Sequence, residues 1–184
     1  MKKYTILLFI IMQFISCNSS KSESNVDENC YIALKAVSDV FKVYDERNKC
    51  LSQLLNEVRT EKNIDTKNVE KIERLSKEIN KQITLSLKSI KNKEIDNKDE
   101  EIFIVSSNYL SKVKELENEI PLLIKDVSDN NPSINLKLKK SISEYCTEVT
   151  QLGNLYHNAM NRYYKIHNMS DKKLDSIENA VEKN

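Results

Sequence analysis

The fold of this chain is decided by one stretch, CYIALKAVSDVFKVYDERNKCLSQLLNEV, which runs from Cys30 to Val58. Its seam of apolar and small residues recurs at alternating steps of three and four: Cys30, Ala33, Val37, Val40, Tyr44, Leu51, Leu54 and Val58. That spacing places the seam on one face of an α-helix. We therefore expect one long amphipathic helix from about Asp27 to Glu61, in which Arg47 alone interrupts the seam.

The same spacing continues along the chain and predicts three more long helices. The second is expected to begin near Val69 and to end near Lys91, the third to span about 99–127 and the fourth about 132–168. Polar stretches, which supply turn and capping residues, separate them. A short fifth helix after Ser170 would carry three apolar residues, Leu174, Ile177 and Val181.

The composition agrees with an all-α protein, because one Gly, two Pro and no Trp are too few turn and sheet formers for a β fold. Four long helices with short loops favour an elongated antiparallel four-helix bundle, followed by the short C-terminal fifth helix. An extended coiled-coil dimer is the alternative, since sustained heptads also specify one. Apolar residues beside the seams widen them and favour the bundle: Leu34, Phe41, Leu55, Phe103, Leu110 and Ile124.

The N-terminus has the pattern of a secretory signal peptide. Lys2 and Lys3 precede an apolar run, Tyr4 to Ile15, which is shorter than the roughly 20 residues of a membrane-spanning helix. Phe14-Ile15-Ser16-Cys17 then resembles the bacterial lipobox, which predicts that Cys17 is lipidated and becomes the first residue of the mature protein. The alternative is an ordinary signal peptide with a chance cysteine.

These features divide the chain into three parts. Residues 1–16 would be the signal peptide, residues 17–29 a lipidated polar tether with too few apolar side chains to bury, and residues 30–184 the helical-bundle domain. Contact with the membrane is expected through the lipid anchor only.

Charge makes nucleic acid an unfavoured partner. Loss of Lys2 and Lys3 with the signal peptide would take the 29 basic and 28 acidic residues to 27 and 28, a formal charge of −1. Binding to nucleic acid or to heparin-like glycans depends on clustered Lys and Arg. The densest basic cluster is short: Lys137, Lys139 and Lys140.

No constellation of residues indicates an enzyme, a metal site or a cofactor. His157 and His167 lie ten residues apart on one predicted helix, which does not direct both at one metal ion, and we expect both to be solvated. The acidic runs ELENE (115–119) and DNKDEE (96–101) are typical of solvated helix faces and helix starts.

The sequence MKKYTILLFIIMQFISCNSS, followed by a polar tether and a helical domain rich in Lys, Asn, Ile and Glu, resembles the surface lipoproteins of Borrelia spirochaetes. The motif-level match covers about the first twenty residues; the remainder is similar in composition and helical architecture. The resemblance implies a lipoprotein of the bacterial outer membrane, exposed on the cell surface and binding a host protein for immune evasion. Complement factor H is the first candidate ligand, because the relapsing-fever factor H-binding lipoproteins are of similar size. A structural or antigenic coat protein, or an adhesin for matrix or glycan ligands, is the alternative.

The remaining cysteines suggest one candidate disulfide. If the first and fourth helices are antiparallel neighbours, Cys50 and Cys146 lie at about the same height. Their heptad positions tell against the bond, since they fall on unlike flanks, so two partly buried thiols that merely pack are the alternative. Cys30 would be a free thiol or form an intermolecular cross-link.

One aromatic residue of the fourth helix is not needed for its seam. The seam takes Tyr156 and Tyr163, whereas Tyr164 falls on an outward position seven residues after His157. An aromatic ring beside arginine and amide side chains is typical of protein–protein hot spots. The alternative is that the short C-terminal helix covers Tyr164. The candidate ligand-binding residues are His157, Asn161, Arg162, Tyr164, Lys165 and Asn168.

Overall fold

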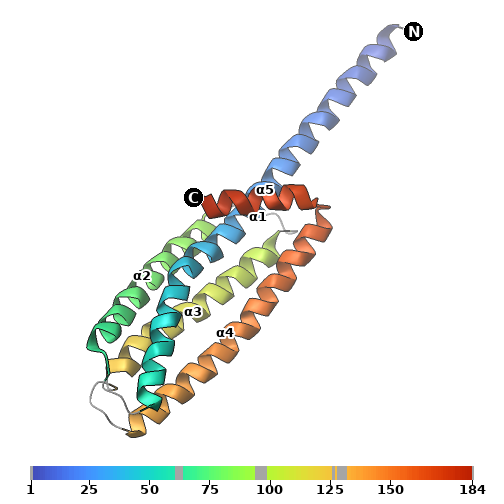
Figure 1. Ribbon diagram of the computed structural model, residues 1–184. Helices are drawn as coiled ribbons and strands as arrows, with labels where there is room; N and C mark the ends of the chain where they lie inside the picture. The colour runs from blue at the N-terminus through green and yellow to red at the C-terminus, as the bar shows by residue number, and fades with distance from the viewer. Residues whose placement is uncertain (1, 61–63, 94–98, 126, 128–131, 184) are drawn as a thin grey trace.

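The structure is a computed structural model that describes the backbone of residues 2–60, 64–93, 99–125, 127 and 132–183, and the side chains of these ranges from residue 25 onward except 132–135. Within them the chain forms five helices and no strand: α1 (Lys2–Arg59), α2 (Thr66–Lys91), α3 (Glu100–Lys125), α4 (Pro132–Ile166) and α5 (Asp171–Lys183). The first four alternate in direction and α5 lies across one end (Figure 1). The predicted all-α antiparallel bundle with a short fifth helix is confirmed.

Local sequence explains where α2 begins and ends. The Asp65 side chain accepts a hydrogen bond from the Lys67 backbone N–H at 3.0 Å, which caps the helix start. At the other end the Asn92 N–H donates to the carbonyl oxygen of Lys88 at 3.1 Å. In α3 the helix continues through Pro121.

The predicted seams form one core shared by all five helices. Ala33, Val40 and Leu54 of α1 are fully buried. The residues beside the seams differ by helix: Phe103, Leu110 and Ile124 of α3 are buried, whereas Leu34, Phe41 and Leu55 of α1 are half-buried. This difference arises because α1 packs closely on α2 but makes few backbone contacts with α4.

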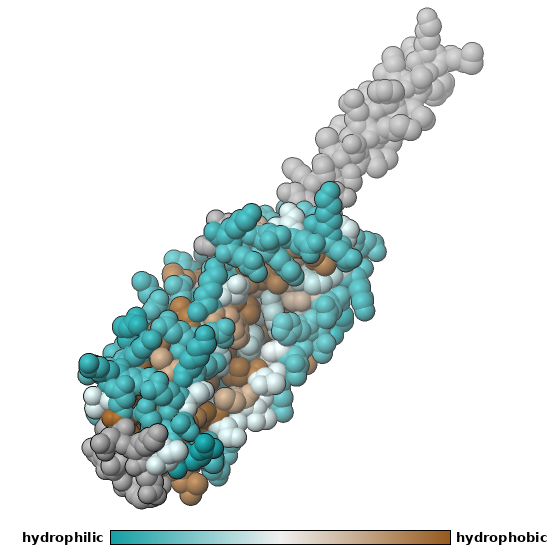
Figure 2. Space-filling model, viewed as in Figure 1, coloured by the Kyte–Doolittle hydropathy of each residue, from teal (hydrophilic) through white to brown (hydrophobic). Residues whose placement is uncertain are grey.

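Aromatic rings fill the space between α1 and α4. The Tyr109 ring of α3 stacks on Phe41 of α1 at 5.7 Å between centroids and on Tyr156 of α4 at 6.1 Å. The ring lies close to Gly153 of α4, where an added Cβ would stand 3.5 Å from the Tyr109 hydroxyl oxygen, an ordinary van der Waals contact. Figure 2 shows a strip of apolar residues on this face of the molecule, between the hydrophilic outer faces of α1 and α4.

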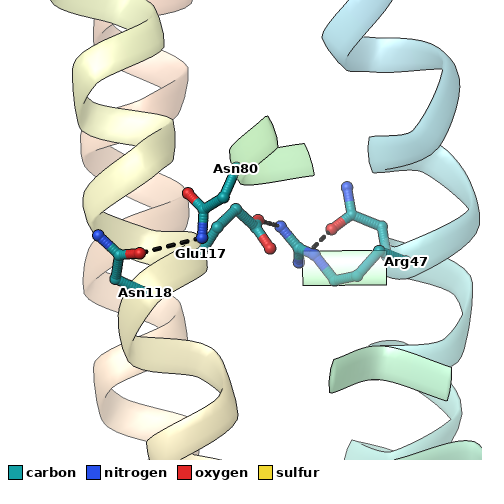
Figure 3. Close-up of polar contacts among 5 residues, drawn as sticks. Arg47, Asn80, Glu117 and Asn118 are labelled. Carbon is teal, nitrogen blue, oxygen red and sulfur yellow. Dashed lines mark hydrogen bonds and ion pairs between the residues drawn. The ribbon is translucent and has the colours of Figure 1, made fainter. Parts of the chain in front are cut away.

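An ion pair is buried in the middle of this core (Figure 3). The Arg47 side chain of α1 is 1% exposed and donates through Nη2 to Glu117 Oε1 of α3, which is 0% exposed. Arg47 also donates through Nη1 to Asn48 Oδ1 at 2.7 Å and lies 4.4 Å from the centroid of the Tyr44 ring. The residue that interrupts the predicted seam therefore faces inward, and the expectation that the ELENE run is wholly solvated is wrong at Glu117.

Burial sets the protonation behaviour of Glu117. It raises the pKa of the carboxyl, while the Arg47 charge and the neighbouring Ser76 hydroxyl lower it. Removing the guanidinium would leave a buried carboxylate without a counter-charge. An unpaired buried carboxylate destabilises the folded state by more than the intact ion pair stabilises it.

Arg47→Met is expected to destabilise the fold by about 3–5 kcal/mol, because it leaves Glu117 unpaired. The double variant Arg47→Met, Glu117→Met is expected to regain most of that loss. Urea unfolding followed by circular dichroism measures both. As a matched control, Lys71→Met breaks an exposed ion pair with Glu46, 2.8 Å in length, and is expected to change stability little.

The deficit of Arg47→Met is expected to grow as pH rises. Without Arg47, the pKa of Glu117 in the folded chain should rise further above the ordinary value of 4.5. A carboxyl that ionises at higher pH in the folded state costs stability as pH rises above its unfolded pKa. The difference from the unsubstituted chain should therefore be small at about pH 4 and larger at about pH 7; an equal difference at both would contradict this assignment.

Candidate functional site

The six residues predicted to bind a ligand lie together at the C-terminal end of α4 but face different neighbours. His157, Asn161, Arg162 and Lys165 are exposed on α4, and Asn168 is exposed just beyond it. Tyr164 is half-buried and packs against the core. Five of the six candidate residues are therefore exposed, whereas Tyr164 packs against the core of the fold. Tyr156 and Tyr163, which the seam required, are buried as predicted.

Arg162 is already engaged by α3. Its Nη2 donates to Glu101 Oε1 at 2.5 Å and its Nε donates to Oε2 at 3.3 Å, a two-pronged contact with about half of each side chain exposed. The hydrogen bond from Arg162 lowers the pKa of the Glu101 carboxyl. A ligand that used Arg162 would have to compete with Glu101 or bind both together.

Tyr164 contacts α1 through a cysteine. Its hydroxyl interacts with the thiol of Cys30. Burial is the main reason that the pKa of the Tyr164 hydroxyl is raised, and Cys30 and Glu178 of α5 raise it further. Cys30 is 0% exposed, and burial together with the Asp27 charge raises the pKa of its thiol to about 12. These contacts favour the alternative in which Tyr164 packs beneath the C-terminal segment. A buried, protonated Cys30 is unsuited to the intermolecular cross-link considered for it.

Asn168 ends α4. It adopts the left-handed conformation with φ of 49°, its N–H donates to the Lys165 carbonyl at 3.3 Å, and the Met169 N–H donates to the Tyr164 carbonyl at 3.0 Å. This is the Schellman arrangement, with asparagine at the position where glycine is commonest. The residue is exposed, yet its conformation is what turns the chain toward α5.

Sequence reasoning missed a cluster centred on Asp99. Asp99 Oδ2 accepts a hydrogen bond from Asn29 Nδ2 at 2.6 Å, and Asp99 Oδ1 lies 2.9 Å from His167 Nε2. The His167 ring also packs 4.4 Å from the centroid of Tyr163. Asp99 is 5% exposed and His167 is half-buried, so the expectation that His167 and the DNKDEE run are fully solvated is wrong at these residues.

Asn29 belongs to a short segment of α1 that bonds to α4, to α5 and to residues just beyond the end of α2 and just before the start of α3, and we call residues 26–30 the collar. The Val26 carbonyl accepts from the Tyr163 hydroxyl at 2.9 Å. Asp27 pairs with Lys173 of α5 at 2.9 Å, and Glu28 pairs with Lys93, just beyond α2, at 2.5 Å. The prediction that residues 17–29 can bury nothing is therefore wrong at Asn29, which is buried, and at Val26 and Asp27, which are half-buried, whereas Glu28 is exposed.

The candidate disulfide is not formed in the structure. Cys50 and Cys146 are both free thiols. Cys50 is buried beside α2, where Asn68 Nδ2 donates to its carbonyl oxygen at 2.9 Å, whereas Cys146 is exposed on α4. The bond is absent, as the unlike heptad flanks indicated, but the alternative of two partly buried thiols is wrong at Cys146, which is exposed.

No group of three or more His, Cys, Asp or Glu side chains is placed to hold a metal ion among the residues that the structure describes. In that same part of the chain, every helix is too short or too polar to cross a membrane. Comparison with protein-family models, with curated proteins and with solved structures finds no match.

Asn168→Val is expected to destabilise the fold by about 1–2 kcal/mol, because a β-branched residue resists the left-handed conformation. Asn168→Gly is expected to be neutral or slightly stabilising. Thermal unfolding measures both. Asn161→Val, at an exposed position inside α4, is the matched control for the effect of valine on helix stability; equal losses at the two positions would show that the turn at Asn168 does not depend on its residue.

Proposed function

We propose that this chain is a lipid-anchored protein of a bacterial outer membrane, exposed on the cell surface, that binds a host protein, with complement factor H as the first candidate. The observation that carries the proposal is Phe14-Ile15-Ser16-Cys17 at the end of a short apolar run that follows two lysines. A cysteine at that boundary is the acceptor that a lipoprotein signal requires. A lipobox cysteine carries three acyl chains, two on its sulfur and one on its amino group, which is more than stable anchoring needs.

The direction of α1 supports this arrangement. Its N-terminal part leaves the bundle at the end where α5 lies (Figure 1). A lipid on Cys17 would hold that end toward the membrane. The opposite end, where α1 gives way to α2 and α3 to α4, would then point away from the cell.

The charge distribution supports a protein ligand over a glycan. Many basic side chains of the described residues are paired with carboxylates, as Lys112 is with Glu148 at 2.6 Å. In the short basic cluster of α4, Lys140 lies 3.8 Å from Glu144. Sulfated glycans and nucleic acids need clustered unpaired cations.

Cys17→Ala is expected to abolish anchoring. The unsubstituted chain, expressed in a spirochaete, should label with palmitate and partition into detergent, and protease added to intact cells should remove it. The variant should neither label nor partition. Palmitate labelling that persists in the variant would contradict lipidation at Cys17, and complete protease resistance of the anchored chain would contradict surface exposure.

Capture from serum tests the ligand. The bundle domain on beads is expected to retain a complement protein in stoichiometric amount, and Arg162→Ala is expected to weaken that capture. Arg74→Ala is the matched control, since Arg74 also pairs with a glutamate, Glu78 at 3.7 Å, but lies on α2. A coat protein would retain nothing, and a glycan adhesin would instead bind heparin at physiological salt.

A further inference from the structure

The middle of α4 lacks charged side chains. Between Tyr145 and Asn161 the only Asp, Glu, Lys or Arg is Glu148, whereas the chain as a whole is 31% charged. Ten side chains of this stretch are exposed, and nine of them are uncharged when histidine is counted as neutral. Glu148 itself is held by Lys112. We call the exposed side chains of residues 145–161 the neutral face.

The neutral face is open along its whole length. α4 packs on α3 and forms one edge of the bundle, while α1 does not close over it (Figure 1). Residues seven apart lie on one side of a helix, so Thr147, Asn154 and Asn161 form its centre line. Gln151 and Asn158 lie beside that line, and Lys140 and Lys165 stand beyond its two ends. Apart from Glu148, which pairs with Lys112, the neutral face carries no charge, and depletion of charged residues is a feature of interface centres.

Two-fold symmetry explains why such a face would lose its charges. In a symmetric dimer the same patch is used by both subunits, so a residue near the axis faces its own copy. A charged residue there meets a like charge, and the contact is repulsive. Asparagine, glutamine and threonine each carry a donor and an acceptor, so they can hydrogen-bond to their own copies. The neutral face therefore suits a second copy of this chain.

The length of the neutral face distinguishes two orientations. In an antiparallel pair of α4 helices only one position lies on the axis, and charges elsewhere could meet opposite charges. In a parallel pair every position of the centre line faces its own copy. From Thr147 to Asn161 the centre line extends for roughly 21 Å without a charge, which fits the parallel pair.

We propose that the neutral face of α4 is a homodimer interface, in which two copies pair their α4 helices in parallel and Thr147, Asn154 and Asn161 each face their own copy. One helix on each side buries less area than a stable dimer needs, so the association is weak and concentration-dependent. The pairing does not rest on lipidation at Cys17, although a parallel pair would bring both N-termini to the same end.

Cysteine cross-linking tests the proposal in the full chain, purified in a mild detergent. In a Cys17→Ser, Cys146→Ser background the remaining native thiols, Cys30 and Cys50, are buried. Thr147→Cys, Asn154→Cys and Asn161→Cys should each give a disulfide-linked dimer when a mild oxidant is added. A disulfide needs the two Cα atoms within about 7 Å, so an antiparallel pair would link one of these positions at most. Ser89→Cys, exposed on α2, is the control for random collision.

Introducing a charge at position 154 tests whether each residue of the centre line faces the same residue of the second copy. With the cross-linking cysteine at position 161, Asn154→Lys and Asn154→Asp should each reduce dimer yield roughly tenfold at low salt. Mixing the two variants should restore it, because opposite charges then face each other. Ser89→Lys should leave the yield unchanged.

Several results would overturn the proposal. They are dimer yields no higher than that of Ser89→Cys, cross-linking at only one of the three positions, and no recovery when the two charged variants are mixed. A monomer whose Asn154→Cys thiol becomes protected from alkylation when serum is added would also overturn it, and would assign the neutral face to a host protein.

Discussion

The buried pair of Arg47 and Glu117 is the interaction on which the rest of the bundle depends. It joins α1 to α3 at residues 70 apart in sequence, and Asn29 and Asp99 are joined with the same separation of 70. Because both contacts join residues 70 apart, and lie 18 residues from each other along α1, they fix how far α1 and α3 can slide past one another. An apolar seam alone tolerates a shift by a heptad, whereas a shift here would leave a buried charge unpaired at a cost of several kcal/mol.

The helices and their seams could be predicted because they depend on local spacing. The alternation of three and four places Ala33, Val40 and Leu54 in the core whatever their partners are. Buried polar residues are different, since a glutamate is buried only if the fold supplies its partner. Nothing near Glu117 in the sequence distinguishes it from its solvated neighbours. The one usable signal was Arg47, because a cation on an apolar seam requires a buried anion on another helix.

The candidate ligand residues show the same limit. Helical spacing correctly placed Tyr156 and Tyr163 in the core. It could not show that Arg162 meets Glu101 of α3, or that Tyr164 meets Cys30 of α1, because both contacts depend on how α4 lies against distant segments. It also missed His167 and Asp99, whose partners are 68 and 70 residues away in sequence.

The collar determines how this molecule would bear a mechanical load. Consecutive residues of α1 bond to Tyr163, Lys173, Lys93 and Asp99, which come from four different parts of the chain. A pull on the N-terminal extension of α1 is therefore shared among several contacts at once. Separate contacts loaded together resist force better than the same contacts broken one after another. A force applied where the chain leaves the bundle would thus be transmitted through the collar to several parts of the domain at once.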